Sequence, residues 1–248
     1  MINKIINKIF QKKYNFDFKV TKKTNKALLL GTYDSINKID LNKYNSYFKI
    51  SHGNFFEHKD IDIIRPDCHI FAGSHPPITE NVSINWWTRC HNKLPLETKI
   101  LVHRKDKKIA EEVFIGREIY FYSTGGQLPV NFKKNIISPS TVVIVGLQLA
   151  IYLNFEEIFL VGINHDWQQV EKYTHFYSHD KPCLEYYLDK EGITISYEEQ
   201  SYPFPKEYLY NVYGLYQQYE TLKKYASSKN IVIYNADPFS VFDVFKKV

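Results

Sequence analysis

Short apolar segments alternate along the chain with longer segments of helical or irregular pattern. Most of the apolar segments lack the apolar–polar alternation of a half-exposed strand, and strands covered on both faces have this appearance. The chain therefore predicts an α/β fold with a doubly wound, mainly parallel sheet. The predicted strands are residues 26–31, 47–51, 68–72, 99–103, 118–122, 157–162 and 230–235.

Two segments predict long helices, and one predicts a lid. Residues 138–155 are apolar almost all round, as in a buried helix, and residues 208–226 carry an apolar face at helical spacing. Residues 164–205 are polar and aromatic without a clear period. Because this stretch is long for an inert loop, we expect a lid insertion within a single domain spanning residues 26–248.

Residues 1–25 predict a basic amphipathic helix followed by a connector. The apolar side chains of residues 2–10 fall on one helical face, and the lysines lie largely elsewhere. Such a helix could make peripheral contact with an anionic membrane surface through residues 1–13. It could equally dock on the body of the protein, or on a second subunit of a homo-oligomer.

Charge and cysteine content exclude several classes of protein. The net charge of the 248 residues is +5, and residues 1–26 hold eight lysines, so the remaining body is close to neutral. A nucleic-acid reader would need a broader basic surface. Three cysteines without C-x-x-C spacing support neither a disulfide framework nor a zinc site. The apolar run at residues 142–153 is shorter than the ~20 residues that span a bilayer, so we expect a cytoplasmic protein, either free or peripheral on the inner face of the membrane.

Small and polar residues follow several of the predicted strands. Ligands of open α/β sheets bind at the carboxyl ends of the strands, where backbone N–H groups and hydroxyls can approach a phosphate. The predicted helix at residue 138 would add an anion site at its first turn, with Ser138 as its cap. The candidate nucleotide-binding residues are Gly31, Thr32, Ser35, His52, Asn54, Gly73, Ser74, Gly125, Ser140, Thr141, Asn164 and Asp166.

Histidines are concentrated in the predicted lid. His165, His175 and His179 are three of the nine histidines in the chain, and histidine can take a proton from a sugar hydroxyl near neutral pH. The H-x3-H spacing of His175 and His179 would suit a metal only on a helix, which the intervening residues do not indicate. We therefore expect neither a metal site nor a cofactor. No G-x-S-x-G motif or informative carboxylate pair indicates a nucleophilic hydrolase.

Several of these segments, in order and spacing, resemble the bacterial sialyltransferases of glycosyltransferase family 42. They also resemble the wider relatives of that family, the motility accessory factors and the pterin diphosphokinase-like proteins. The likeness covers roughly residues 26–180, and the C-terminal IYNADPFSVFDVF is also typical of the wider group. The segments are KALLLGTYDSINKID, FKISHGNFFEHKD, CHIFAGSHPP, SPSTVVIVGLQLAIYLNFEEIFLVGIN and THFYSHD.

The resemblance implies a Rossmann-like domain with a lid, and an inverting, metal-independent transfer from a CMP-activated nonulosonic acid. In that family a lid histidine deprotonates the acceptor hydroxyl, and lid tyrosines hydrogen-bond the departing phosphate. Carried over, the base is His179 or His175, and the tyrosines are Tyr173 and Tyr177.

The turns after the first strands depart from the family pattern, which leaves the donor open. The first turn of the family reads G-N-G-P-S where this chain has Gly31-Thr32-Tyr33-Asp34-Ser35, and His52 stands in place of an asparagine. We expect a glycosyltransferase that moves a sugar from a nucleotide donor, CMP-linked or another, onto a bacterial cell-surface glycan in lipopolysaccharide or capsule biosynthesis.

Two other activities remain open from the sequence. The first is a pterin diphosphokinase-like pyrophosphate transferase, which would need magnesium and for which Asp34 and Asp166 are the candidate acidic ligands. The second is a non-catalytic protein that binds a glycan or a nucleotide.

Overall fold

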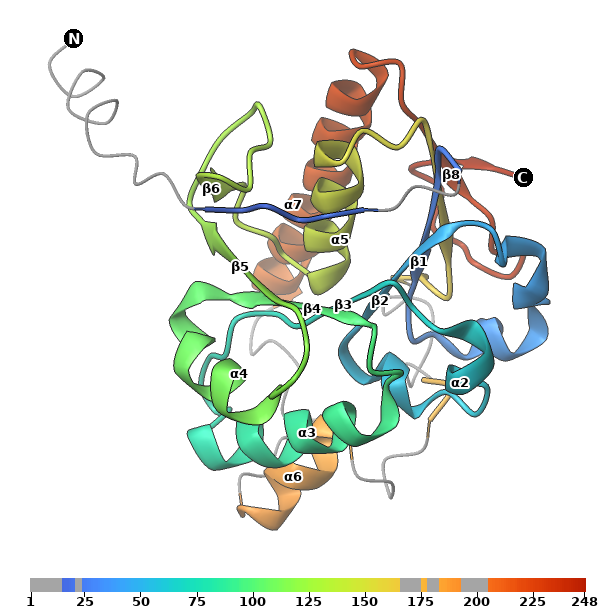
Figure 1. Cartoon of the computed structure of the whole chain (residues 1–248). Helices are drawn as coiled ribbons and strands as arrows, with labels where there is room; N and C mark the ends of the chain where they lie inside the picture. Colours follow the sequence, from blue (N-terminus) through green and yellow to red (C-terminus); the bar gives the residue numbers. More distant parts are fainter. Residues whose placement is uncertain (1–14, 21–23, 166–174, 178–182, 193–204) are drawn as a thin grey trace, which may run out of the picture.

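The computed structural model describes residues 15–20, 24–165, 175–177, 183–192 and 205–248 (Figure 1). The predicted helix at residues 2–10 and most of the predicted lid lie outside these ranges. Within the described part of the chain, no helix combines the length and the apolarity that a bilayer crossing requires.

A twisted parallel sheet forms the centre of the molecule. The described residues contribute nine strands in the order β6-β5-β4-β3-β2-β1-β7-β8-β9, and every pair of neighbours is parallel. The predicted α/β class and all seven predicted strands are confirmed. The strands are β1 Lys26–Leu30, β2 Phe48–His52, β3 Cys68–Ile70, β4 Lys99–His103, β5 Ile119–Thr124, β6 Asn135–Ile136, β7 Glu157–Val161, β8 Val232–Asn235 and β9 Lys246–Lys247.

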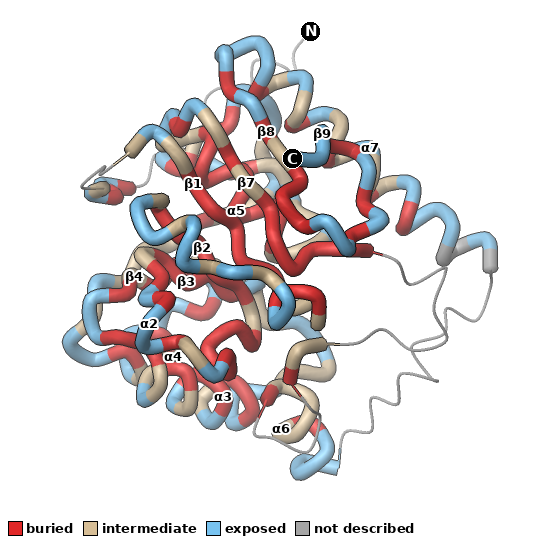
Figure 2. The backbone as a smooth tube through the Cα atoms, turned by 90° about the vertical axis from the view of Figure 1, so that its right-hand side faces the viewer, coloured by how far each residue is buried: buried red, intermediate tan, exposed pale blue. Residues whose placement is uncertain are grey.

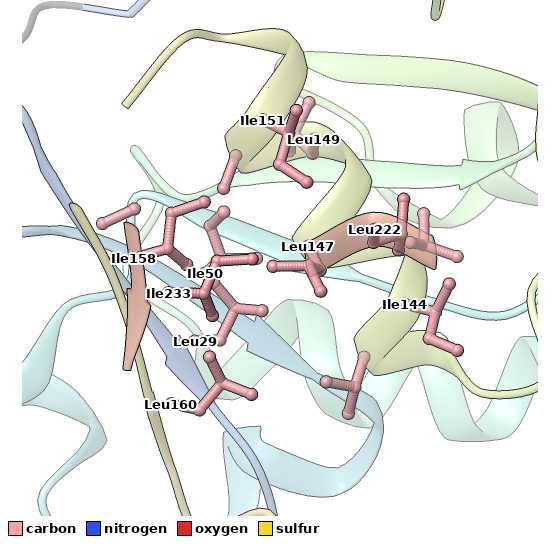
Figure 3. Close-up of a cluster of buried hydrophobic side chains, with 14 of the residues drawn as sticks. Leu29, Ile50, Ile144, Leu147, Leu149, Ile151, Ile158, Leu160, Leu222 and Ile233 are labelled. Carbon is pink, nitrogen blue, oxygen red and sulfur yellow. The ribbon is translucent and has the colours of Figure 1, made fainter. Parts of the chain in front are cut away.

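Burial on both faces explains why the central strands are continuously apolar. Along β1, Leu29 packs into the core on one face of the sheet, and Leu28 and Leu30 pack into a second core on the other face. Figure 2 shows the central strands as buried segments between the helices. Figure 3 shows the first core, in which Leu147 of a helix points toward strand residues such as Leu29, and Ile144 lies on the side of Leu222.

Helices cover both faces of the sheet. Two of them, α5 and α7, cover one face, and α3 and α4 cover the other (Figure 1). The α-helices are α2 Ile61–Ile64, α3 Glu80–Lys93, α4 Lys107–Val113, α5 Val142–Tyr152, α6 Leu184–Lys190 and α7 Pro205–Ser227, and the 3-10 helices are η1 Asp34–Lys38, η2 Leu41–Tyr44, η3 Gly53–Glu57 and η4 Arg104–Asp106.

The prediction that a helix starts at residue 138 is wrong, because α5 begins at Val142 with Thr141 as its N-cap residue. Side chains hold the preceding segment in an extended form. The amide of Gln148 bonds both the backbone N–H and the C=O of Ile137, each at 3.0 Å. Ser138 also precedes a proline, which disfavours the helical conformation for it. The predicted helix at 208–226 is confirmed as α7.

Residues 15–20 pack on the domain although they precede the predicted domain boundary at residue 26. The side chains of Phe16 and Phe18 are buried in the same core as α5, and the ring centroid of Phe16 lies 4.9 Å from that of Phe132. The segment crosses the helix layer as an extended strip (Figure 1). Phe16 and Phe18 therefore make this segment part of the packed domain.

The strand order reverses at β1. The chain moves outward from β1 through β2 to β6, and then returns to place β7 on the other side of β1. Ligands of doubly wound sheets bind at the carboxyl ends of the strands that flank such a reversal. The turns after β1, β2 and β7 are therefore the expected position of a site.

Candidate active site

A cleft of about 220 Å³ opens at the point where the strand order reverses. The turns after β1, β2 and β7 form its floor, α5 begins on one side of it, and α3 and α6 lie on the other side. We call these three turns the switch-point half of the sheet edge. The cleft is lined by Gly31, Thr32, His52, Gly53, Asn54, Trp86, Val142, Val143, Gly162, Ile163, His165, His175, Tyr177, Leu184 and Glu185.

Two glycines bring the turns after β1 and β7 into backbone contact. A Cβ atom on Gly31 would lie 2.1 Å from the carbonyl oxygen of Gly162, so no larger residue fits there. The same carbonyl accepts a hydrogen bond of 2.9 Å from the N–H of Tyr33. Gly162 itself has a φ of 66°, a conformation that glycine adopts without strain. The floor of the cleft is therefore bare backbone.

A buried carboxylate that follows β8 holds these turns in place. Asp237 is fully buried. Its Oδ2 accepts hydrogen bonds from Ser35 Oγ at 2.5 Å and from Gly162 N at 3.0 Å, and its Oδ1 accepts one from Phe239 N at 2.9 Å. Ser35 therefore lies beneath the turn and outside the lining of the cleft.

Neutral histidines support the turn after β2. His52 Nδ1 donates to the carbonyl of Leu30 at 3.0 Å, and burial lowers the pKa of His52 to about 4. His69 accepts from Ser51 Oγ at 2.7 Å and donates to the carbonyl of Gly53 at 3.0 Å. Burial, together with His52 nearby, lowers the pKa of His69 to about 3. Both rings are uncharged near neutral pH.

Residues 175–177, which belong to the predicted lid, lie at the cleft, and each of them contacts the body of the protein. His175 pairs with Tyr33 in an antiparallel bridge, and Phe176 donates its N–H to the carbonyl of Thr32 at 3.1 Å. The ring of Phe176 packs against Phe55, and the ring of Tyr177 stacks on that of His175 with centroids 4.7 Å apart and an interplanar angle of 8°. These contacts place the imidazole at the cleft.

Thr32 selects the tautomer of His175. The Nδ1 atom lies 3.0 Å from Thr32 Oγ1 and 3.4 Å from the carbonyl oxygen of Thr32. Because a carbonyl oxygen only accepts, the tautomer with a proton on Nδ1 satisfies both contacts. That tautomer leaves the basic lone pair on Nε2, which is the arrangement that a general base requires.

Asn54 links the sheet edge to α3, to Tyr177 and to α6. Its Oδ1 accepts from Trp86 Nε1 at 2.7 Å. Its Nδ2 donates to the hydroxyl of Tyr177 at 2.9 Å and to Glu185 Oε2 at 3.1 Å. The amide is therefore occupied by the protein itself and positions Tyr177 and Glu185.

The start of α5 supplies the electropositive side of the cleft. Val142 and Val143, the first two residues of α5, line it, and the N-terminus of a helix favours an anion. No lysine or arginine is among the described residues of the lining. Within the described part of the chain, no cluster of three or more His, Cys, Asp or Glu side chains could hold a metal ion.

The structure brings together six of the thirteen described site residues that the sequence predicts. Six line the cleft: Gly31, Thr32, His52, Asn54, His175 and Tyr177. Seven lie outside the lining: Ser35, Gly73, Ser74, Gly125, Ser140, Thr141 and Asn164. Tyr173, His179 and Asp166 lie outside the described residues. Sequence reasoning missed Trp86, Glu185 and Asp237, whose roles depend on partners far away in the chain.

Ser140 and Asn164, which also lie outside the lining, bond distant parts of the chain. The N–H of Ser140 donates to Gln218 Oε1 at 2.9 Å. Asn164 Oδ1 accepts from Ser240 Oγ at 3.1 Å and from Val241 N at 2.6 Å. Asn164 therefore fastens the C-terminal segment to the turn after β7.

The turns after β3, β4 and β5, which we call the outer half of the sheet edge, bond to one another. Ser74 donates its N–H to Asp106 Oδ2 at 2.9 Å, and its hydroxyl bonds the other carboxylate oxygen. His103 Nε2 lies 3.4 Å from the hydroxyl of Thr124. None of these residues lines the cleft.

Comparison with known proteins gives matches among solved structures. No protein-family model matches the chain, and no curated protein sequence matches it. The sialyltransferase CST-II in complex with a trisaccharide acceptor and CMP matches with a TM-score of 0.51 and 13% identity, over 90% of this chain and 85% of that chain.

Two further structures of this enzyme agree. CstII from Campylobacter jejuni with a substrate analogue, cytidine-5′-monophosphate, matches with a TM-score of 0.53 and 14% identity, over 93% of this chain and 86% of that one. A variant in complex with CMP matches with a TM-score of 0.55 and 15% identity, over 90% and 85%. The chain has a sialyltransferase-like fold.

Proposed function

We propose that this protein is a glycosyltransferase that moves a sugar from a nucleotide-activated donor, CMP-linked as the leading case, to a hydroxyl of a glycan acceptor. The observation that carries the proposal is the orientation of His175 at the switch-point cleft. The imidazole is held by Thr32 on Nδ1 and by the ring of Tyr177 on its face, so its basic nitrogen is set for proton transfer.

The fold supports a nucleotide donor and a glycan acceptor. The similar structures are of a sialyltransferase, and they hold CMP and, in one case, a trisaccharide acceptor. In this chain the bare backbone of Gly31 and Gly162 and the start of α5 meet at the cleft. Both features suit a phosphate group.

In the proposed reaction, His175 Nε2 takes the proton from the acceptor hydroxyl as its oxygen attacks the anomeric carbon of the donor. A bond forms between that oxygen and the anomeric carbon, and the bond from this carbon to the phosphate oxygen breaks. The electron pair of the broken bond leaves with the nucleotide. The displacement inverts the configuration at the anomeric carbon. The transfer of the acceptor proton to His175 requires no metal ion.

The departing phosphate gains negative charge, which the start of α5 would stabilise. Tyr177 would hydrogen-bond the same phosphate. Asn54 Nδ2 donates to the phenol oxygen at 2.9 Å, and Tyr177 lines the cleft. His179 and Tyr173 remain the alternative base and the second tyrosine.

Thermal unfolding with a panel of nucleotides tests the binding step, and hydrolysis of a CMP-linked sugar with and without EDTA tests the chemistry. We expect CMP to raise the Tm and turnover to persist in EDTA. His175→Ala should lower turnover by about 10²- to 10⁴-fold, the contribution of a general base, while binding of CMP is retained.

Other outcomes point to the alternatives. Stabilisation by ATP with magnesium-dependent turnover would indicate a pyrophosphate transferase instead. Full activity of His175→Ala with loss of activity in His179→Ala would transfer the role of base to His179. Nucleotide binding without any turnover would indicate a non-catalytic binding protein.

A further inference from the structure

The cleft has an acidic group on the side opposite the start of α5. Glu185 lies in the first turn of α6 and lines the cleft, whereas Val142 and Val143 line it from α5. The two helices approach from opposite faces of the sheet (Figure 1). A ligand that crosses the sheet edge therefore meets an electropositive helix start at one end and a carboxylate at the other.

The position of the Glu185 carboxylate is determined by the protein. Asn54 Nδ2 donates to its Oε2 at 3.1 Å, and Trp86 fixes the same amide from the other side at 2.7 Å. Burial and the neighbouring Glu185 carboxylate raise the pKa of the Cys183 thiol to about 12, so this thiol stays protonated beside the carboxylate.

No ion pair among the described residues includes Glu185. A carboxylate offers about four lone-pair sites, more than its neighbours Asn54 and Cys183 use. It accepts hydrogen bonds from hydroxyls and repels phosphate. A vicinal diol is the neutral group that matches a carboxylate with acceptor sites to spare, because both of its hydroxyls can donate to the two oxygens.

We propose that Glu185 is a specificity-determining residue that binds a vicinal diol of the donor while its phosphate lies at the start of α5. The inference rests on the proposed function, since it assumes a nucleotide-sugar ligand. Two parts of such a ligand carry a diol, the ribose and the transferred sugar. The nucleotides used in the test distinguish them.

Calorimetric titration of the full-length protein with CMP, with 2′-deoxy-CMP and with CMP-N-acetylneuraminic acid tests the proposal. A hydrogen bond to a charged group contributes enough to change affinity by about tenfold or more. If Glu185 binds the diol of the ribose, the wild type binds CMP about tenfold more tightly than 2′-deoxy-CMP, and Glu185→Gln abolishes this preference. If Glu185 binds a diol of the transferred sugar, CMP and 2′-deoxy-CMP bind with equal affinity. Glu185→Gln then lowers only the affinity for CMP-N-acetylneuraminic acid.

Asp189→Asn is the matched control, because it removes the same charge from an exposed position of the same helix. It should change each affinity by less than about twofold. Thermal unfolding of both variants shows that they are folded. If Glu185→Gln behaves as Asp189→Asn does for every ligand, the inference is overturned and the proposed function still stands. If the wild type binds none of the three nucleotides, the CMP-linked donor of the proposed function fails, and the inference fails with it.

Discussion

The two halves of the sheet edge carry similar residues and end in different structures. In both halves a glycine follows a strand, a serine or threonine follows the glycine, and a buried aspartate lies nearby. In the outer half Ser74 and Asp106 bond each other. In the switch-point half Asp237 accepts hydrogen bonds from Ser35 and Gly162. The hydroxyl of Thr32 contacts His175 at the cleft.

The difference teaches that turn composition alone does not make a site. Strand order decides which turns face a cleft, because only at the reversal do the helices on the two faces diverge from neighbouring strands. In the outer half, the polar groups of the turns and strand ends bond one another instead. Matched substitutions in the two halves test this distinction.

The largest effect is expected for the two buried aspartates. Asp237→Ala leaves three donors without their acceptor, and we expect a loss of about 4 kcal/mol in the free energy of unfolding together with loss of nucleotide binding. Asp106→Ala should cost about 2 kcal/mol and leave nucleotide affinity within about threefold. Urea unfolding and calorimetry measure both. Equal loss of binding in the two variants would contradict the distinction.

The next effect concerns the two glycines. Gly31→Ala forces a methyl group against the backbone carbonyl of Gly162, at 2.1 Å before relaxation, and should cost about 3 kcal/mol of stability. At Gly73 the nearest atom is the Cε of Lys105 at 2.8 Å, the end of a flexible side chain. Gly73→Ala should therefore cost less than about 1 kcal/mol. Urea unfolding compares them, and a smaller loss for Gly31→Ala would show that the turn can open.

Acid should destabilise the switch-point half first. The pKa of His52 is about 4 in the folded protein because the ring is buried, against about 6.5 when the chain is unfolded. The unfolded state therefore binds more protons as the pH falls. The contribution of His52 to the free energy of unfolding is therefore fully present above about pH 6.5. It is lost as the pH falls to about 4, and the loss is at most about 3 kcal/mol.

Urea unfolding at pH 7.5 and at pH 4.5 measures this loss. His52→Gln should reduce the difference in unfolding free energy between the two pH values. The half-buried His103 of the outer half has a pKa that burial lowers less far, so His103→Gln should change that difference less. An unchanged difference in His52→Gln would show that the ring is not buried neutral.

The smallest effect is expected for the two hydroxyls. Thr32→Val keeps the shape of the side chain and removes the hydroxyl contact to His175 at 3.0 Å, while the backbone carbonyl of Thr32 stays 3.4 Å from Nδ1. Turnover should fall about tenfold with a shifted pH profile while CMP affinity is kept. Thr32→Ser should restore both. Ser74→Ala should leave turnover within about twofold, since Ser74 contacts only the outer half. Steady-state kinetics over a pH series separates these outcomes.

Local sequence pattern predicted seven of the nine described strands and the long helix α7. The unbroken apolar runs predicted the seven central strands, because a strand covered on both faces has no polar side to display. The sequence also predicted His175 and the turn residues Gly31, Thr32, His52 and Asn54 as site residues, since ligands bind at turns on the carboxyl edge of a parallel sheet, and all five line the cleft. The start of α5 was predicted too early in the chain. The side chains of Gln148 and Gln218 accept hydrogen bonds from backbone N–H groups of the segment before α5, so this segment does not join the helix.

Only the tertiary structure decided which of these residues meet. Asp237 contacts Ser35 across 202 positions of sequence, and Asn54 contacts Glu185 across 131. Such pairs follow from the strand order and from the crossovers, which no local pattern encodes. The sequence by itself therefore determined seven of the described strands and a set of candidate polar turns. The packing of the two helix layers selected the turns that form the cleft and placed Glu185 opposite the start of α5.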